Sequence, residues 1–136
     1  LLDMLEKGYI PVVSPLAGTS DGVIVNINAD TIATQIAIAL KTEKLILFTN
    51  TKGVYHGEKV LNTLTVEQIC TTLKHIVKDG MAVKTANAVA AIHGGVKRVH
   101  IINGLSKHSL LSEVLTKKGI GTMISSEKEK RIYLKE

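Results

Sequence analysis

Aromatic residues are scarce in this chain, which has three tyrosines, one phenylalanine and no tryptophan among its 136 residues. Proteins that bind single-stranded nucleic acids usually stack the bases on aromatic rings, and nucleic-acid-binding proteins in general gather their basic residues into a patch or stripe. The formal net charge is +5, but the lysines are scattered from Lys7 to Lys135. The composition therefore argues against a nucleic-acid-binding protein.

Cysteine and long apolar runs are also nearly absent. The single cysteine, Cys70, has no partner for a disulfide, and its apolar helical context predicts a buried residue in a reducing compartment. No apolar run approaches the roughly 20 residues that a membrane helix needs, and no signal peptide is recognisable. Because 45% hydrophobic and 21% charged residues are ordinary for a globular protein, the expectation is a single soluble domain over 1–136.

The chain alternates between two hydrophobic periodicities. Apolar residues at helical spacing predict helices, and short β-branched apolar runs predict strands. Because strands and helices alternate with short connections, the sequence predicts an α/β fold with three αβα layers around a mainly parallel sheet. The predicted helices cover 1–8, 29–40, 65–77, 81–92 and 109–115, and the predicted strands cover 9–15, 22–25, 44–49, 96–102 and 121–124.

The other segments are interpreted from their polar and glycine content. Residues 16–22 are dense in turn formers and predict a loop, and 50–61 predict either a loop or a small hairpin. The charged tail that starts at Glu127 is expected to be solvated, and 132–134 could add an edge strand. The first eight residues have the form of a helix end closed by a glycine cap and include no initiating Met. The first residues of a longer protein are therefore expected to be absent.

The stretch from Asn26 to Asp30 joins a predicted strand to the start of a helix. Asn28 is a good N-cap, and Asp30 falls in the first turn, where a carboxylate interacts favourably with the helix dipole. Such a junction is also where α/β proteins bind polar ligands, because the first backbone N–H groups of the helix are unpaired. Asn26 and Asn28 can both donate and accept hydrogen bonds, which suits a substrate with carboxylate or amide groups. The residues alone leave both interpretations open, a capped helix or a binding site.

Lys84 lies within the first two turns of a helix that Gly80 is predicted to open. The helix dipole opposes a cation at this end, so a lysine here is a poor choice for stability alone. It becomes sensible if an anion such as a phosphate lies between the lysine and the helix end. The alternative is a lysine that simply points into solvent.

A polar loop, residues 49–55, follows an apolar strand that is expected to be buried on both faces. Open α/β sheets bind ligands at such strand ends. The loop lacks the GxxxxGK[ST] pattern of a P-loop, and the chain contains no GxGxxG, so neither standard phosphate fingerprint is present. No metal site is predicted, because the histidines show no metal-ligand spacing. They stand at 56, 75, 93, 100 and 108, and most are interpreted as structural or surface residues.

Several strings, taken in order, resemble the acetylglutamate kinases of the amino acid kinase family. The resemblance is to the C-terminal, nucleotide-binding half of those enzymes and extends from residue 1 to about 125. The N-x-N-A-D string together with the G-x-G-T-M-I ending separates the chain from uridylate, aspartate and glutamate 5-kinases of the same fold. The strings are PVVSPL at 11–16, NINADT at 26–31, TNTKGV at 49–54, GMAVK at 80–84, HSLL at 108–111 and GIGTMI at 119–124.

The resemblance implies phosphoryl transfer from ATP to the side-chain carboxylate of N-acetyl-L-glutamate, in arginine or ornithine synthesis, with Mg²⁺ held mainly by the phosphates. It implies that Lys84 stabilises the charge on the phosphoryl group in flight and that Asp30 orients the active-site lysines. It also implies that Asn26 contacts the acetylglutamate, with Asn28 in the same substrate-binding stretch. The nucleotide-binding residues that it implies are Thr49, Asn50, Gly53, Tyr55, Ile76, Gly80, Met81 and Lys84.

Two departures from the family pattern bear on activity. The family usually carries Asp where this chain has Asn50, so that contact with the nucleotide changes from charged to neutral. The glycine-rich N-terminal segments of the family, with a second phosphate-binding lysine and much of the acetylglutamate pocket, have no counterpart here. The chain is therefore expected to be half an active site, which needs the missing N-terminal half of the same protein and forms a homo-oligomer at full length.

In arginine-inhibited members of the family, a C-terminal region helps to form the effector site, so the resemblance implies an arginine effector. The residues that match it are His108, Glu113 and the stretch from Gly119 to Thr122. Two alternatives to an acetylglutamate kinase stay open, a non-catalytic module that senses a nucleotide or an amino acid and another kinase of the family. A biosynthetic kinase of this kind is expected in the cytoplasm or the plastid stroma.

Overall fold

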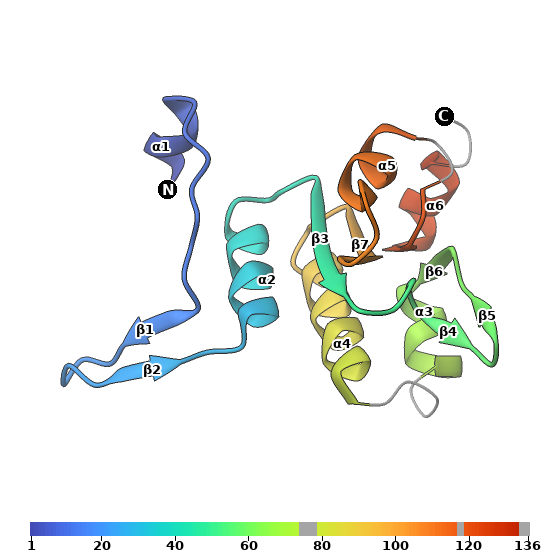
Figure 1. Ribbon diagram of the computed structural model, residues 1–136, viewed down its shortest axis with the longest axis horizontal. Coiled ribbons are helices and arrows are strands. Elements are labelled where there is room, and N and C mark those ends of the chain that lie inside the picture. Colours follow the sequence, from blue (N-terminus) through green and yellow to red (C-terminus); the bar gives the residue numbers. More distant parts are fainter. Residues whose placement is uncertain (74–78, 117–118, 134–136) are drawn as a thin grey trace.

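A four-stranded sheet lies at the centre of the computed structural model, which describes residues 1–73, 79–116 and 119–133 (Figure 1). Two strand pairs, β3 with β7 and β6 with β8, are parallel, and β7 and β8 are antiparallel. The expectation of an α/β fold with parallel strands is confirmed, and one antiparallel pair makes the sheet mixed. In spatial order the strands are β3 (Lys44–Thr49), β7 (Arg98–Asn103), β8 (Thr122–Ser125) and β6 (Thr63–Thr65).

Helices cover both faces of this sheet. Strand side chains alternate between faces, and Val99 and Ile101 of β7 belong to the same apolar core as Ala88 and Ala91 of α4 (Asp79–His93). The side chains on the other face of β7, such as His100, contact α5 (Ser109–Leu115) and α6 (Glu127–Tyr133). Helix α2 (Ala29–Ala39) packs against α4 (Figure 1). The three expected αβα layers are therefore confirmed.

The N-terminal part of the chain extends away from the sheet as an arm (Figure 1). It consists of α1 (Leu2–Glu6), an irregular segment, and a hairpin of β1 (Leu16–Gly18) and β2 (Ile24–Asn26). A second hairpin, β4 (Tyr55–His56) with β5 (Lys59–Val60), follows β3, as one of the two sequence alternatives predicted. Helix α3 (Val66–Gln68) begins at the Thr65 capping box and continues as the π-helical turn η1 (Ile69–Leu73).

Four sequence predictions are wrong in the arm, the tail and the strand at the sheet edge. Residues 9–15 form no strand, and Ile10 and Val12 are 91% and 95% exposed, because no described strand lies beside them to bury their side chains. The first residues of the expected loop at 16–22 pair with β2. The tail forms the helix α6 as far as Tyr133, so the edge strand that 132–134 could have added is not present in the described part of that segment. Strand β3 is half-exposed along its length because it pairs only with β7 in the described chain.

Two smaller differences concern Cys70 and β6. Cys70 is exposed, since it lies on the π-helical turn with its side chain toward solvent, and the prediction of a buried cysteine is wrong. Strand β6 was not predicted, because Thr63–Thr65 is too short to show a hydrophobic period. It pairs with β8 and closes the sheet at the edge opposite β3.

Gly121 directly precedes β8 and supports a stability prediction. A Cβ at this position would overlap the carbonyl oxygen of Ile101, which pairs with Thr122, and the Gly121 backbone N–H is bonded to Glu113, so neither group can move away without breaking these contacts. Gly121→Ala is expected to lower the free energy of unfolding by about 1–3 kcal/mol. Urea denaturation measures this, with Gly18→Ala as the control because a Cβ there meets no atom within 4 Å. Equal losses in the two variants would contradict the packing argument.

Candidate active site

Three element ends meet at one edge of the sheet. Strand β3 ends at Thr49, which pairs with Asn103 at the end of the parallel strand β7. The first turns of α2 and α4 lie on the same side of the molecule as this strand end (Figure 1). Helix N-termini and the carboxyl ends of parallel strands are where α/β sheets bind anionic ligands.

Lys84 and Asp30 join the two helices at this edge. The Lys84 ammonium donates to both oxygens of the Asp30 carboxylate, with Nζ 2.8 Å from Oδ2 and 3.1 Å from Oδ1. The two side chains are 17% and 23% exposed, so the pair is partly buried but open to solvent. The anion that the helix dipole requires beside Lys84 is thus supplied, at least in part, by the chain itself. The alternative of a lysine pointing freely into solvent is wrong.

The two asparagines precede this ion pair. The Asn28 side chain accepts a hydrogen bond from the Thr31 backbone N–H at 3.2 Å, so its predicted role as N-cap of α2 is confirmed. Asn26 is the last residue of β2, and its exposed side chain makes no hydrogen bond within the described ranges. Both lie within four residues of Asp30, on the path by which the arm enters the body of the molecule.

The loop after β3 has an exposed polar part and a buried anchor. Thr49 and Asn50 lie at its start, where Asn50 is exposed, and Tyr55 opens the β4–β5 hairpin. Gly53 and Val54 are buried, and a Cβ on Gly53 would lie only 2.5 Å from Thr122 Oγ1. The glycine is therefore required by the close approach of the loop to β8, whatever else it binds.

The remaining residues of the expected nucleotide set belong to the segment before and within α4. Gly80 and Met81 lie in the first turn of α4, three to four residues before Lys84. Gly80 is exposed, and Met81 packs against the apolar core. Ile76 lies outside the described residues.

Glu113 is the most heavily hydrogen-bonded of the four expected effector residues. Its Oε1 lies 2.6 Å from His100 Nδ1, and its Oε2 accepts the backbone N–H groups of Ile120 at 2.6 Å and Gly121 at 3.0 Å. The carboxylate is only 4% exposed. Burial alone would raise the pKa of Glu113, but the hydrogen bonds from His100, Ile120 and Gly121 outweigh it and hold the pKa below its usual value.

The other three expected effector residues occupy different surroundings. Gly119 has φ +61°, a left-handed conformation that favours glycine, and its Cβ position lies 3.0 Å from Glu113 Oε2. Thr122 is fully buried, and its hydroxyl accepts the Val54 backbone N–H at 2.8 Å. His108 is exposed at the start of α5 and makes no hydrogen bond to Glu113. The structure thus brings Glu113 and Gly119 together, and it places Thr122, at the start of β8, in contact with the loop after β3.

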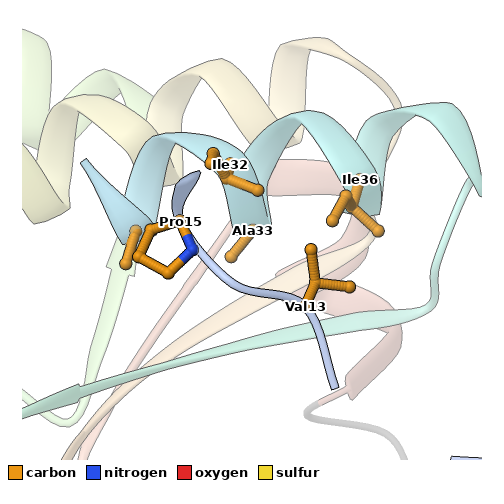
Figure 2. A pocket seen from close by; sticks show the side chains of 6 residues that line it. Val13, Pro15, Ile32, Ala33 and Ile36 are labelled. Atoms are coloured by element: carbon orange, nitrogen blue, oxygen red, sulfur yellow. The ribbon is translucent and has the colours of Figure 1, made fainter. Parts of the chain in front are cut away.

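An apolar cavity of about 110 Å³ lies between the arm and α2 (Figure 2). Val13 and Pro15 line it from the arm, and Ile32 and Ile36 line it from α2, together with two alanines. Phosphates and carboxylates need hydrogen-bond donors or cations, and these side chains offer neither. The cavity is therefore distinct in chemistry from the edge that carries Lys84.

Comparison with known protein families identifies the family of this chain. The model of the amino acid kinase family matches residues 1–103. The chain belongs to the amino acid kinase family. Acetylglutamate kinase from Kosmotoga olearia is 46% identical over 124 residues, covering 90% of this chain and 44% of the relative. Acetylglutamate kinase from Carboxydothermus hydrogenoformans is 42% identical over 130 residues, covering 92% and 44%.

A solved structure extends the comparison beyond acetylglutamate kinases. N-acetylglutamate synthase from Neisseria gonorrhoeae, complexed with coenzyme A and L-arginine, is 32% identical and superposes with a TM-score of 0.87. The match covers 93% of this chain and 30% of the synthase. This amino acid kinase chain spans less than half the length of each of these relatives.

Clusters of metal-ligating side chains and helices able to span a membrane are both absent from the described residues of this amino acid kinase chain. No group of three or more His, Cys, Asp or Glu side chains there could hold a metal ion. Asp30, the carboxylate at the candidate site, is already bonded to Lys84. Of the helices described, none has both the length and the apolar composition that a membrane crossing requires.

Two contacts in the structure were not predicted from the sequence. The Thr122 hydroxyl reaches a backbone N–H 68 residues away, and threonine in a strand carries no signal of such a bond. Arg98 pairs with Glu129 at 2.8 Å and lies 5.0 Å from the centre of the Tyr133 ring, which holds α6 against β7. An arginine at the start of an otherwise apolar strand, followed by an acidic tail, is the only signal that could have indicated it.

Proposed function

We propose that this chain is the ATP-binding half of an acetylglutamate kinase, with Lys84 and Asp30 as the residues that carry phosphoryl transfer. The observation that carries the proposal is the bidentate Lys84–Asp30 pair at the edge where β3, α2 and α4 meet, in a chain 42–46% identical to acetylglutamate kinases. Phosphoryl transfer depends on positioning and charge neutralisation more than on covalent chemistry. A lysine held by a carboxylate supplies both.

The reaction places a distinct demand on each residue. A side-chain carboxylate oxygen of N-acetyl-L-glutamate bonds to the γ-phosphorus of ATP as the bond from that phosphorus to the β,γ-bridging oxygen breaks, which leaves an acyl phosphate and ADP. Negative charge spreads over the transferred group, and the Lys84 ammonium stabilises it. Asp30 holds that ammonium in place and is the positioning residue.

The remaining contacts follow from the family resemblance. Thr49, Asn50, Gly53, Tyr55, Gly80 and Met81 border the nucleotide, as does Ile76, and Asn26 and Asn28 border the acetylglutamate. Mg²⁺ arrives with the ATP phosphates and neutralises part of their charge. Because the chain spans less than half of its relatives, the part that they add completes the site.

An acceptor assay tests this proposal. The 136-residue chain is assayed alone and after being joined to the part of the Kosmotoga olearia relative that it does not match, with MgATP and either N-acetyl-L-glutamate, L-glutamate or L-aspartate. ADP release and hydroxylamine trapping of the acyl phosphate report transfer. We expect turnover only in the joined protein and at least about tenfold faster with N-acetyl-L-glutamate, because a site built for the acetyl group leaves its polar groups unpaired with the other acids. Fast turnover by the isolated chain, or equal rates with all acceptors, would refute the proposal.

A second candidate function is an arginine-sensing module. The likeness to an N-acetylglutamate synthase solved with L-arginine favours it, as do Glu113 and Gly119, which adjoin each other beside α5. In this chain His108, Glu113, Gly119 and Thr122 are the candidate effector residues. Calorimetric titration with L-arginine, run beside the acceptor assay, discriminates the two functions: a sensing module binds arginine and leaves ATP intact in the joined protein, whereas a kinase transfers the γ-phosphate whether or not it binds arginine.

A further inference from the structure

The start of β8 touches the loop after β3 through a single buried hydroxyl. Thr122 Oγ1 accepts the Val54 backbone N–H at 2.8 Å, and both residues are 0% exposed. Gly53 lies so close that any Cβ would meet the same hydroxyl at 2.5 Å. The loop therefore rests on Thr122 with no space between them.

The same loop is held by hydrogen bonds at Gly53 and Val54 and is exposed at Asn50 and Lys52. The Val54 carbonyl accepts the Leu61 backbone N–H at 2.8 Å, and the Thr51 hydroxyl donates to the Gly53 carbonyl at 3.2 Å. Asn50 and Lys52, in contrast, are exposed. A loop that is rigid at Gly53–Val54 and polar at its tip can present fixed groups to a ligand.

The start of β8 is itself held from the other side. The buried Glu113 carboxylate accepts the backbone N–H groups of Ile120 and Gly121, and Gly121 lies directly against the Ile101 carbonyl. Hydrogen bonds thus connect Glu113 to the backbone of Ile120 and Gly121, and the next residue, Thr122, to Val54. Apart from Ile120, which is 43% exposed, these residues are buried and offer no surface to a nucleotide.

We infer that Thr122 is a positioning residue for the loop after β3, and that Glu113 holds Thr122 in place. This inference rests on the proposed function, because it takes that loop as part of the nucleotide site. It assigns Thr122 to the nucleotide site, whereas the family resemblance implied that Thr122 belongs to an effector site. Losing the hydroxyl leaves the buried Val54 N–H unpaired, which raises the energy of the ordered loop without touching the nucleotide directly.

Two measurements on the 136-residue chain test the inference, with Thr122→Val as the main variant. Hydrogen exchange at the Val54 amide is expected to be about tenfold faster in this variant, and the Kd for MgATP about fivefold higher, since one buried hydrogen bond is lost. Thr122→Ser, which keeps the hydroxyl, is expected to restore most of both values. Thr34→Val is the matched control, because Thr34 Oγ1 is buried without a hydrogen-bond partner in the described residues. If Thr122→Val is too unstable to purify, Gly53→Ala tests the same contact.

The outcomes distinguish a failure of the inference from a failure of the proposed function. Faster exchange and weaker MgATP binding in Thr122→Val, with recovery in Thr122→Ser, support the inference. Val54 exchange that changes no more than in Thr34→Val would overturn the contact whether or not the protein is a kinase. Faster exchange with an unchanged Kd would overturn the positioning role alone. No MgATP binding by the unsubstituted chain would overturn the proposed nucleotide site, and the inference with it.

Discussion

Replacing Lys84 with alanine is expected to lower kcat about 10²–10³-fold in the joined protein, the loss typical when one group that stabilises transition-state charge is removed. Lys84 has the only ammonium seen to bridge α2 and α4 at the candidate edge in the described residues, and its Nζ is already directed by two hydrogen bonds. KM for MgATP is expected to change less than kcat, because the charge that Lys84 meets develops mainly during transfer. Steady-state kinetics with varied MgATP measures both.

Two further variants show whether the effect belongs to this lysine. Lys97→Ala removes an ammonium that is 58% exposed and only 3.6 Å from Glu43, so kcat is expected to stay within about twofold. Asp30→Asn keeps the shape of the side chain and removes its charge, and is expected to lower kcat less than Lys84→Ala because the ammonium remains but is less well oriented. A Lys84→Ala protein that is folded and as fast as Lys97→Ala would contradict the assigned role.

Replacing Glu113 with glutamine is expected to lower the free energy of unfolding by about 2–4 kcal/mol, because a buried group that accepts three hydrogen bonds, one from a histidine, loses its charge. A glutamine side chain has only one acceptor oxygen, and its NH2 group only donates. It therefore cannot accept hydrogen bonds both from His100 and from the Ile120 and Gly121 N–H groups, and one of these two sets loses its partner. Urea denaturation at pH 7 measures the loss. Glu127→Gln, on the exposed first turn of α6, is the control and is expected to change stability by less than about 0.5 kcal/mol.

The same variant carries a pH dependence. The pKa of Glu113 lies below its ordinary value of 4.5 in the folded chain, so its ionised form adds stability at all pH values above about 4.5. That contribution disappears as the pH falls from there through the lowered pKa. The difference in unfolding free energy between the unsubstituted chain and Glu113→Gln is therefore expected to shrink on acidification below pH 4.5. A difference that stays constant down to pH 3 would show that charge on Glu113 is not what stabilises the fold.

Local features of the chain were predictable because their causes are local. The N-cap at Asn28 and the capping box at Thr65 depend on residues three positions apart, and both are present in the structure. Strand β3 followed from a continuous apolar run, and β7 from a short run rich in valine and isoleucine. The dipole argument at Lys84 correctly required an anion but did not name one. The family resemblance pointed to Asp30, and the fold brings that carboxylate to Lys84 from 54 residues earlier.

Features that depend on distant partners were not predictable in this way. Residues 9–15 have the composition of a buried strand, yet composition does not say which surface covers a strand, and Ile10 and Val12 are exposed. The tail is held as the helix α6 by Arg98, 31 residues before Glu129. The effector region was predicted only through resemblance, and the structure shows the Thr122 hydroxyl bonded to the loop after β3.

Phosphorus NMR of the reaction mixture tests the central claim most directly. The joined protein is incubated with MgATP and N-acetyl-L-glutamate, and the γ-phosphorus of ATP is followed. The account predicts that this signal is replaced by that of an acyl phosphate, together with ADP, and that Lys84→Ala suppresses the replacement while MgATP still binds. Binding of MgATP without any acyl phosphate in the unsubstituted protein would contradict it and identify the chain as part of a sensing module.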